Sequence, residues 1–265
     1  MMQVTTYMPK LIFFDLDGTL AESKRPLTDD VARLLAQLLK HTKVAIISGG
    51  ALPQFLEQVV GQLPLNANLL HLYLLPTSGA AFYEWSGDPS KRLGAGWHKI
   101  YEERLTDAER REIEAAMYEA ATETGLIDFK TASFGERIEY RGGQVSLSAL
   151  GQEAPVAVKR EWDPDKAKRR ALQRAIASRL PGYAVRMGGM TTIDVNKHGV
   201  DKAYGIHQLC ERLHIPESDT LYVGDQLVEG GNDEAVFRTG AATHAVSSLE
   251  DTEALIRGLL AGLDK

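Results

Sequence analysis

Cysteine is nearly absent from this 265-residue chain, which has a single one, Cys210. One thiol excludes an internal disulfide framework and a metal site built on several cysteines. Long apolar runs are also missing, because no stretch of about 18 apolar residues is available to cross a bilayer. The first ten residues lack the apolar segment of a signal peptide. We therefore expect a cytoplasmic protein that does not enter a membrane.

Positive charge is not in excess either. Lys and Arg total 30 against 36 Asp and Glu, which gives a formal net charge of −6. Proteins that bind nucleic acids usually present a basic field, so we expect no nucleic-acid partner. The hydrophobic fraction of 44% is ordinary for a globular protein, and the length is sufficient for a core domain that carries an insert.

Three short apolar runs predict strands that are buried on both faces. They cover residues 10–14, 43–47 and 220–223, and each is followed by a glycine and by an acidic or small polar residue. Between the first two runs, Thr28 precedes an amphipathic segment and is typical of a helix N-cap. Strand, helix and strand in this order favour an α/β fold with a doubly wound, Rossmann-like parallel sheet.

The middle of the chain has a different pattern. A helix is predicted over residues 106–125, and alternating segments at 137–141, 144–150 and 156–162 predict strands. Gly142-Gly143 indicates a hairpin between the first two of these segments.

This α+β block predicts a second domain. Further on, residues 163–180 read as a helix, and residues 183–187 and 191–195 as strands. We predict an inserted α+β cap domain over residues 86–189 and a catalytic core formed by residues 1–85 and 190–265.

The strongest chemical signal is the string from Asp15 to Leu20, DLDGTL, directly after the first predicted strand. Two carboxylates at i and i+2 can divide the work of phosphoryl transfer. Asp15 would attack phosphorus and form an aspartyl-phosphate, and Asp17 would act as general acid and then as general base. Two like charges this close require a cation, and Mg²⁺ is expected. The alternative is an acidic turn in which Asp and Gly have only backbone roles.

Polar residues after the other two strands strengthen the catalytic interpretation. In open α/β sheets, ligands bind outside the carboxyl ends of the strands. We therefore expect Asp15, Asp17, Ser48 and Asp225 to converge at one edge of the sheet, although they are far apart in the sequence.

Together these segments resemble the haloacid dehalogenase (HAD) superfamily of phosphotransferases. DLDGTL is similar to its first motif, Ser48 after KVAII to its second, Lys202 in GVDKAYGI to its third, and GDQLVEGGND at 224–233 to its fourth. The resemblance implies that Ser48, Gly49 and Lys202 bind the phosphoryl group. It also implies an Mg²⁺ site held by Asp15, by the main-chain carbonyl of Asp17 and by Asp225, with Asn232 and Asp233 as ligands or directly behind them.

Each of these matches has a structural alternative when taken singly. Ser48 also fits a helix N-cap, and Lys202 also fits a solvated lysine at the start of a helix. The order of all four motifs along the chain favours the catalytic interpretation.

The predicted insert lies between the second and third motifs, as in class IIB (Cof-type) members of the superfamily. Its segment 137–152, RIEYRGGQVSLSALGQ, resembles the cap of eukaryotic-type phosphomannomutases. That likeness implies that Arg141 binds the phosphate that is not transferred, and that Thr192 and Asp194 bond sugar hydroxyls. Just after the first motif, Lys24 or Arg25 is a further candidate for a substrate phosphate, and the alternative is a solvated cation of the loop.

Two arginines of that family fall at Phe134 and Gln152 in this chain. Neither side chain can bind a phosphate by charge. The weaker expected grip on a second phosphate favours an Mg²⁺-dependent phosphatase that hydrolyses a hexose phosphate.

Two other functions stay open. One is a hexose phosphomutase of the phosphomannomutase type, and the other is a non-catalytic binding protein with the HAD fold, against which the intact Asp15 and Lys202 argue. The expected partner is a small phosphorylated sugar. The resemblance also allows a homodimer formed by the cap.

Overall fold

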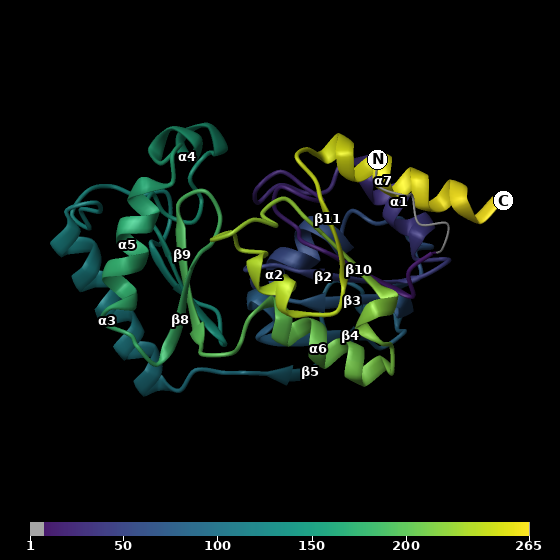
Figure 1. Cartoon of the computed structure of the whole chain (residues 1–265), viewed down its shortest axis with the longest axis horizontal. Helices are drawn as coiled ribbons and strands as arrows, with labels where there is room; N and C mark the ends of the chain where they lie inside the picture. Colours follow the sequence, from purple (N-terminus) through teal and green to yellow (C-terminus); the bar gives the residue numbers. More distant parts are fainter. Residues whose placement is uncertain (1–7, 265) are drawn as a thin grey trace. The chain divides into compact units, whose positions relative to one another are not determined.

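The computed structural model describes residues 8–264, so most of the N-terminal segment considered above lies outside the described residues (Figure 1). The chain forms two compact units. The first contains the described residues up to Tyr101 and those from Lys202 onward, and the second is Glu102–Asp201. Across residues 8–264, no helix combines the length and the apolar character that crossing a membrane requires.

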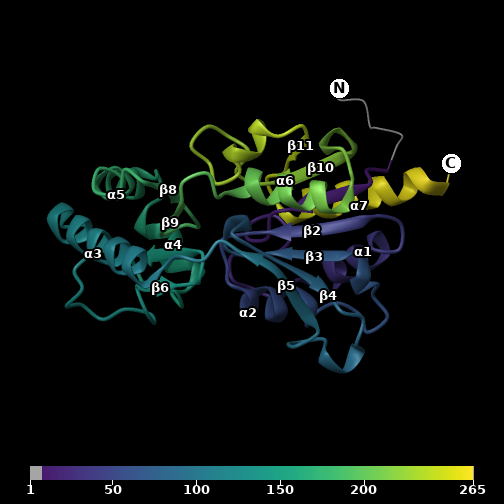
Figure 2. The same cartoon turned by 90° about the horizontal axis from the view of Figure 1, so that it is seen from below.

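The first unit is built on a seven-stranded sheet in the order β11-β10-β1-β2-β3-β4-β5. The strands are β1 (Leu11–Phe14), β2 (Lys43–Ile47), β3 (Leu72–Leu75), β4 (Ala81–Trp85), β5 (Trp97–Glu102), β10 (Thr220–Gly224) and β11 (Ala242–Ala245). The pairs from β11 to β3 are parallel, and β4 is antiparallel to β3. Figure 2 shows β2, β3, β4 and β5 side by side. The predicted parallel α/β sheet is confirmed, with an extension at one edge that the sequence did not predict.

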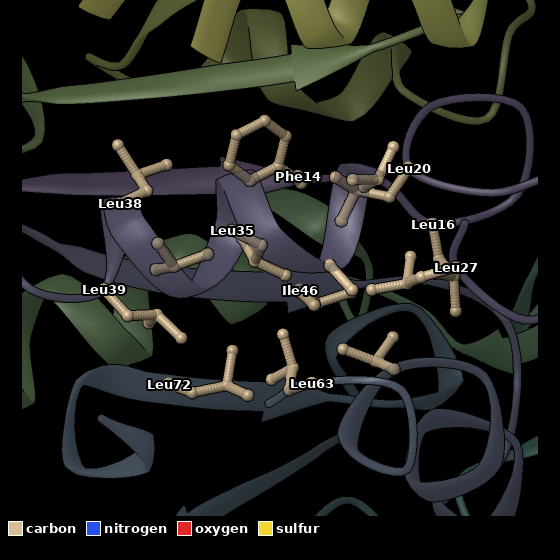
Figure 3. Packing of buried hydrophobic residues seen from close by; sticks show 14 of the residues in the cluster. Phe14, Leu16, Leu20, Leu27, Leu35, Leu38, Leu39, Ile46, Leu63 and Leu72 are labelled. Atoms are coloured by element: carbon tan, nitrogen blue, oxygen red, sulfur yellow. The ribbon is translucent and has the colours of Figure 1, made fainter. Parts of the chain in front are cut away.

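Helices cover both faces of this sheet. Since successive residues of a strand point to opposite faces, each strand contributes residues to the core on both sides. Ile12 and Phe14 pack in one cluster with residues of α1 (Asp29–Leu38) and α7 (Leu249–Ala261), part of which is seen in Figure 3. Leu11 and Phe13 belong to another cluster, which includes residues of α6 (Lys202–Leu213). All four residues of β1 are therefore buried, as its continuous apolar run predicted.

The remaining elements of the first unit are short. α2 (Leu52–Phe55) leads into a π-helix at Leu56–Val60. The 3₁₀ helices are Leu69–His71, Thr77–Gly79, Pro89–Lys91, Glu217–Asp219, Glu234–Arg238 and Gly262–Asp264.

The second unit has a four-stranded sheet in the order β6-β7-β9-β8, with every pair antiparallel. Its strands are β6 (Ile138–Tyr140), β7 (Gln144–Ser148), β8 (Tyr183–Met187) and β9 (Thr192–Lys197). α3 (Asp107–Thr124) and α5 (Ala167–Ala177) pack on one face, where Val145, Leu147, Ile193 and Val195 are buried. The predicted hairpin joins β6 to β7 at Gly142, whose φ of 82° suits glycine.

Residues 156–162 correct one expectation. They were predicted as a strand and instead form α4 (Val156–Trp162). Pro155 precedes the helix with φ −60°, a value compatible with a helical first turn, and its carbonyl accepts a hydrogen bond from Lys159 N at 3.0 Å. The run Lys159-Arg160-Glu161 also consists of good helix formers, which outweighs the short apolar alternation.

The limits of the second unit differ from the predicted 86–189. Residues 86–101 stay with the first unit because β5 is the edge strand of its sheet. Residues 190–201 belong to the second unit because β9 is an inner strand of its sheet.

A buried ion pair anchors the start of α5. Asp163 accepts hydrogen bonds from Lys168 N at 2.9 Å, from Arg169 N at 3.2 Å and from Arg169 Nε at 2.7 Å. Arg169 Nη1 also donates to Gly189 O at 2.7 Å, which ties α5 to the segment between β8 and β9. Burial alone would raise the pKa of Asp163, but the hydrogen bonds from Arg169 and from the two main-chain N–H groups lower this pKa below the ordinary value of 3.8.

We predict that Asp163→Asn lowers the free energy of unfolding at pH 7 by roughly 3 kcal/mol, because Arg169 is left without its buried partner. The lowered pKa means that the carboxylate contributes fully above pH 3.8 and loses this contribution as the pH falls through the folded-state pKa. In urea unfolding, the difference from wild type should therefore be steady near neutral pH and shrink below pH 3.8.

Asp165→Asn is the matched control. Asp165 is exposed and accepts only one described hydrogen bond, from Ala167 N at 3.0 Å. Its substitution should change the free energy of unfolding by less than about 0.5 kcal/mol. Equal losses in the two variants would contradict the role of the buried pair.

Candidate active site

The candidate site lies at the carboxyl ends of three adjacent strands of the first unit. β1 lies between β10 and β2, and all three run parallel. Asp15 follows β1, Ser48 follows β2 and Asp225 follows β10, so the three residues leave the sheet at the same edge. Asp15 N still donates to Val223 O at 2.9 Å, which keeps the start of the loop in line with the sheet.

Lys202 connects the acidic groups of the site. Its Nζ lies 2.5 Å from Asp15 Oδ1 and 2.6 Å from Asp233 Oδ1, and it donates a third hydrogen bond to the Tyr222 hydroxyl at 3.1 Å. Tyr222 in turn donates to Asp233 Oδ1 at 2.6 Å. All four side chains are buried. The three hydrogens of the ammonium are thus all used by protein groups.

Burial and neighbouring charges shift the pKa values here. Burial raises the pKa of Asp15 well above its ordinary value, Lys202 lowers it, and the carboxylates of Asp233 and Asp225 raise it again. Burial would lower the pKa of Lys202, but Asp15 and Asp233 raise it, so the ammonium stays charged. Burial also raises the pKa of Asp225. One ammonium among three carboxylates leaves an excess of negative charge, which favours a second cation.

Three buried oxygen atoms of the site fit such a cation. Asp15 Oδ2, Asp225 Oδ1 and Asn232 Oδ1 have no hydrogen-bond partner. Gly18, with φ 95°, lets the Asp225 carboxylate approach, since a Cβ there would lie 2.7 Å from Asp225 Oδ2. Mg²⁺ prefers oxygen ligands and commonly binds through one or two carboxylates together with waters. Within residues 8–264, no three His, Cys, Asp or Glu side chains are grouped for a metal, so the fit is to this two-carboxylate type.

The carboxylates of Asp17 and Asp233 have protein partners on both oxygens. Asp233 Oδ1 binds Lys202 and Tyr222, and its Oδ2 accepts from Gln226 N at 3.0 Å. Asp17 Oδ1 accepts from Lys24 N at 2.7 Å, and its Oδ2 from Gln54 Nε2 at 3.4 Å. Both oxygens of Asp233 are therefore engaged by protein groups. Asp233 is the partner of Lys202, and the three unpartnered oxygen atoms are the ones that fit the cation.

Ser48 is buried at the end of β2, and its carbonyl accepts from Ser78 N at 2.8 Å. The helix-cap alternative does not hold, because the N-cap position of α2 is Ala51. Gly49, the next residue after Ser48, is half-buried. The Arg25 side chain is exposed, while its carbonyl accepts from Gln58 Nε2 at 2.7 Å.

In the second unit, Asp194 and Thr192 alternate along β9 with residues that pack under the helices, so they point to the other face of the sheet. Asp194 accepts from Ser146 Oγ at 2.5 Å. The strand register aligns one row of polar residues across all four strands: Glu139, Ser146, Asp194 and Arg186.

Arg141, the predicted phosphate ligand of this unit, is paired with an acid. Its Nε and Nη2 lie 3.0 and 2.6 Å from Glu139 Oε2, and Nη2 also donates to Gln152 Oε1 at 3.1 Å. The charge of Arg141 is therefore balanced within the unit.

Tyr222, Gln54 and Ser146 were not predicted as site residues from the sequence. Alternation along β10 places Tyr222 on the same face as Gly224. The tyrosine could have been noticed there as a polar group within an otherwise apolar strand. Gln54 and Ser146 stand out only through their contacts across the fold, with Asp17 and Asp194 respectively.

We predict that Mg²⁺ raises the melting temperature of the wild type, because an ion that binds the folded state alone stabilises it by mass action, by about 2.7 kcal/mol at 100 times Kd. Asp225→Asn should lose most of this shift, since it removes one of the charged oxygen ligands. Thermal unfolding with EDTA and with added Mg²⁺ measures both. The control is Glu229→Gln, an exposed residue of the same loop. An unchanged Mg²⁺ response in Asp225→Asn would exclude the site.

Comparison with known proteins supports the interpretation of the motifs. The sequence model of haloacid dehalogenase-like hydrolases matches residues 12–239. A probable phosphomannomutase of Caenorhabditis elegans is 23% identical over 261 residues, which cover 96% of this chain and 96% of that protein. The phosphomannomutase of Saccharomyces cerevisiae is 24% identical over 257 residues, with 94% and 93% covered.

Among solved structures, an IMP-bound IMP-nucleotidase mutant of Plasmodium falciparum matches with a TM-score of 0.69 at 18% identity, covering 96% of this chain and 67% of that chain. A protein from Streptococcus mutans matches with a TM-score of 0.61 at 17% identity, covering 97% and 98%. These two matches show the fold. The match of the sequence model over residues 12–239 establishes that the chain belongs to the haloacid dehalogenase-like hydrolase family.

Proposed function

We propose that the protein is an Mg²⁺-dependent hexose phosphomutase that carries the phosphoryl group on Asp15. The observation that carries this proposal is the arrangement of the Asp15 carboxylate. Lys202 Nζ lies 2.5 Å from Oδ1, and Oδ2 is buried without a hydrogen-bond partner. A buried carboxylate whose rotation is fixed by Lys202 through one oxygen, and whose other oxygen is left for the metal, is oriented for nucleophilic attack.

In the first step, Asp15 forms a bond to phosphorus as the bond from phosphorus to the sugar oxygen breaks. Asp17 gives its proton to that departing oxygen. Lys202 and the Ser48-Gly49 segment bind the phosphoryl oxygens and stabilise their charge. Mg²⁺, held by Asp15, Asp225 and Asn232, would supply further neutralisation of that charge. In the second step, a hydroxyl of the sugar phosphate forms a bond to the phosphorus of phospho-Asp15 as the bond from phosphorus to Asp15 breaks. Asp17 accepts the proton of that hydroxyl, and the Asp15 carboxylate is restored.

The relatives support transfer to a sugar better than transfer to water. Proteins named phosphomannomutase align with this chain over nearly their full length. The sequence favoured a phosphatase because of Phe134 and Gln152, with a phosphomutase as the alternative, and the relatives favour that alternative. Hydrolysis stays as the second candidate because Glu139 balances the charge of Arg141, which weakens the hold of that arginine on a second phosphate.

One assay separates these functions. The protein is incubated with mannose or glucose 1-phosphate and with the 6-phosphates, with and without a catalytic amount of hexose 1,6-bisphosphate. We expect isomerised sugar phosphate that requires the bisphosphate. Free phosphate without isomerisation would support the phosphatase instead, and no reaction across a broad panel of phosphate esters would support a binding protein.

Two aspartate variants should separate the steps. We predict that Asp15→Asn abolishes the phosphoenzyme and lowers turnover by more than about 10³-fold, because the nucleophile is lost. Asp17→Asn should still form phosphoenzyme from acetyl phosphate, whose leaving group needs no proton, but should slow turnover by about 10²- to 10⁴-fold. Mass spectrometry of the quenched protein detects the phosphoenzyme.

The control is Asp29→Asn, at an exposed position in the first turn of α1, which should behave as wild type. Turnover by Asp15→Asn at the wild-type rate would exclude the covalent route. Unimpaired turnover by Asp17→Asn would remove its assignment as acid and base.

A further inference from the structure

Gln54 lies within reach of the Asp17 carboxylate. Its Nε2 donates to Asp17 Oδ2 at 3.4 Å, while Lys24 N donates to Oδ1 at 2.7 Å. Each carboxylate oxygen therefore has a donor from outside the DLDGTL string, and two donors on two oxygens define the rotation of the carboxylate. The longer distance is typical of catalytic hydrogen bonds in ligand-free structures, which tighten when the substrate binds.

A glycine makes room for the Gln54 amide. A Cβ at Gly50 would lie 2.4 Å from Gln54 Oε1, 2.6 Å from its Cδ and 3.1 Å from its Nε2. The first two distances are shorter than any real Cβ contact, so the amide packs directly on the main chain of Gly50. The absence of a side chain at Gly50 therefore leaves the space that the Gln54 amide occupies beside Asp17.

The same helix also holds the second donor in place. After α2 the chain forms the π-helix Leu56–Val60, in which Gln58 is buried. Gln58 Nε2 donates to Arg25 O at 2.7 Å, and Gln58 O accepts from Leu27 N at 2.9 Å. The loop that contains Lys24 is thereby attached to the helix that contains Gln54. Single π turns inside helices are rare overall, and those that occur are frequently found at functional sites.

We propose that Gln54 is a positioning residue that orients Asp17 for both of its proton transfers. This inference rests on the proposed function. An amide side chain can donate through its nitrogen and accept through its oxygen, whereas the Lys24 N–H can only donate. Gln54 can therefore serve Asp17 as a carboxylate and as a carboxylic acid. It keeps the group aligned when the proton leaves for the sugar oxygen and when a proton returns from the attacking hydroxyl.

Leaving groups of different basicity test this role. A sugar alkoxide must be protonated by Asp17 as it departs, whereas 4-nitrophenolate leaves without a proton. For Gln54→Leu, which keeps the bulk and removes the amide, we expect phosphoenzyme formation to slow about tenfold with hexose 1,6-bisphosphate as the phosphoryl donor. With 4-nitrophenyl phosphate the same step should slow by less than about twofold. Rapid-quench measurement of the phosphoenzyme gives both rates.

Gln62→Leu is the matched control for this substitution. Gln62 is exposed, its Nε2 donates to Glu57 O at 2.9 Å, and it should retain wild-type rates with both substrates. Gly50→Ala should reproduce the selective loss of Gln54→Leu, since its Cβ would displace the amide. Gly94→Ala, where a Cβ would have no atom within 4 Å, is the control for that change. The double variant of Gly50→Ala with Gln54→Leu should be no slower than Gln54→Leu alone.

Wild-type rates in Gln54→Leu would overturn the inference. An equal loss with the two substrates would also overturn it, because a merely structural defect lowers both rates alike. Wild-type protein that forms no phosphoenzyme from either substrate would instead overturn the proposed function, and the inference with it. Measurements on the wild-type protein therefore distinguish failure of the inference about Gln54 from failure of the proposed function.

Discussion

The buried ammonium of Lys202 is the interaction on which the rest of the site depends. It lies between Asp15 and Asp233, two carboxylates that burial would otherwise leave uncompensated. Removing one partner of such a group typically costs 3–5 kcal/mol, so the three charges form one unit. Asp15 and Lys202 are 187 positions apart, and their contact requires the end of β1 and the start of α6 to meet. The charge balance thus constrains the fold as well as the chemistry.

The sheet brings the other residues of the site together. β1 lies between β10 and β2 and is covered on both faces, so its end cannot move relative to theirs. The loops that follow these strands carry Asp15, Asp225 and Ser48. Gly18 allows the Asp225 carboxylate to lie close to the loop after β1, because a Cβ at this position would be 2.7 Å from Asp225 Oδ2. Rigid strands thus set the positions of the functional groups, and the loops need only supply the side chains.

The elements that the sequence predicted correctly had strong local signals. The continuous apolar runs of β1 and β2 and the Gly142 hairpin are examples. The signal at residues 156–162 was too short, and a seven-residue alternation proved equally compatible with α4. The local sequence does not indicate that β5 and β9 belong to different sheets. The predicted limits of the second domain, 86–189, therefore differ from those of the second unit, Glu102–Asp201. Within the site, the resemblance to the family motifs predicted Asp15 and Lys202, and the structure brings these two side chains together. Tyr222 and Gln54 are recognised only through partners from distant segments.

The saturated ammonium has a consequence for affinity. In the proposed reaction, each hydrogen that Lys202 would give to a phosphoryl oxygen must first leave Asp15, Asp233 or Tyr222. The tyrosine hydroxyl is the neutral partner and, at 3.1 Å, the most distant one. Hydrogen bonds to charged acceptors are stronger, so exchange of the tyrosine contact costs least. The free energy of binding a phosphate ester in the ground state therefore gains only the difference between the new hydrogen bond to phosphate and the hydrogen bond to Tyr222 that it replaces. A site built this way avoids holding its phosphate esters too tightly, and it regains the tyrosine contact each time a product departs.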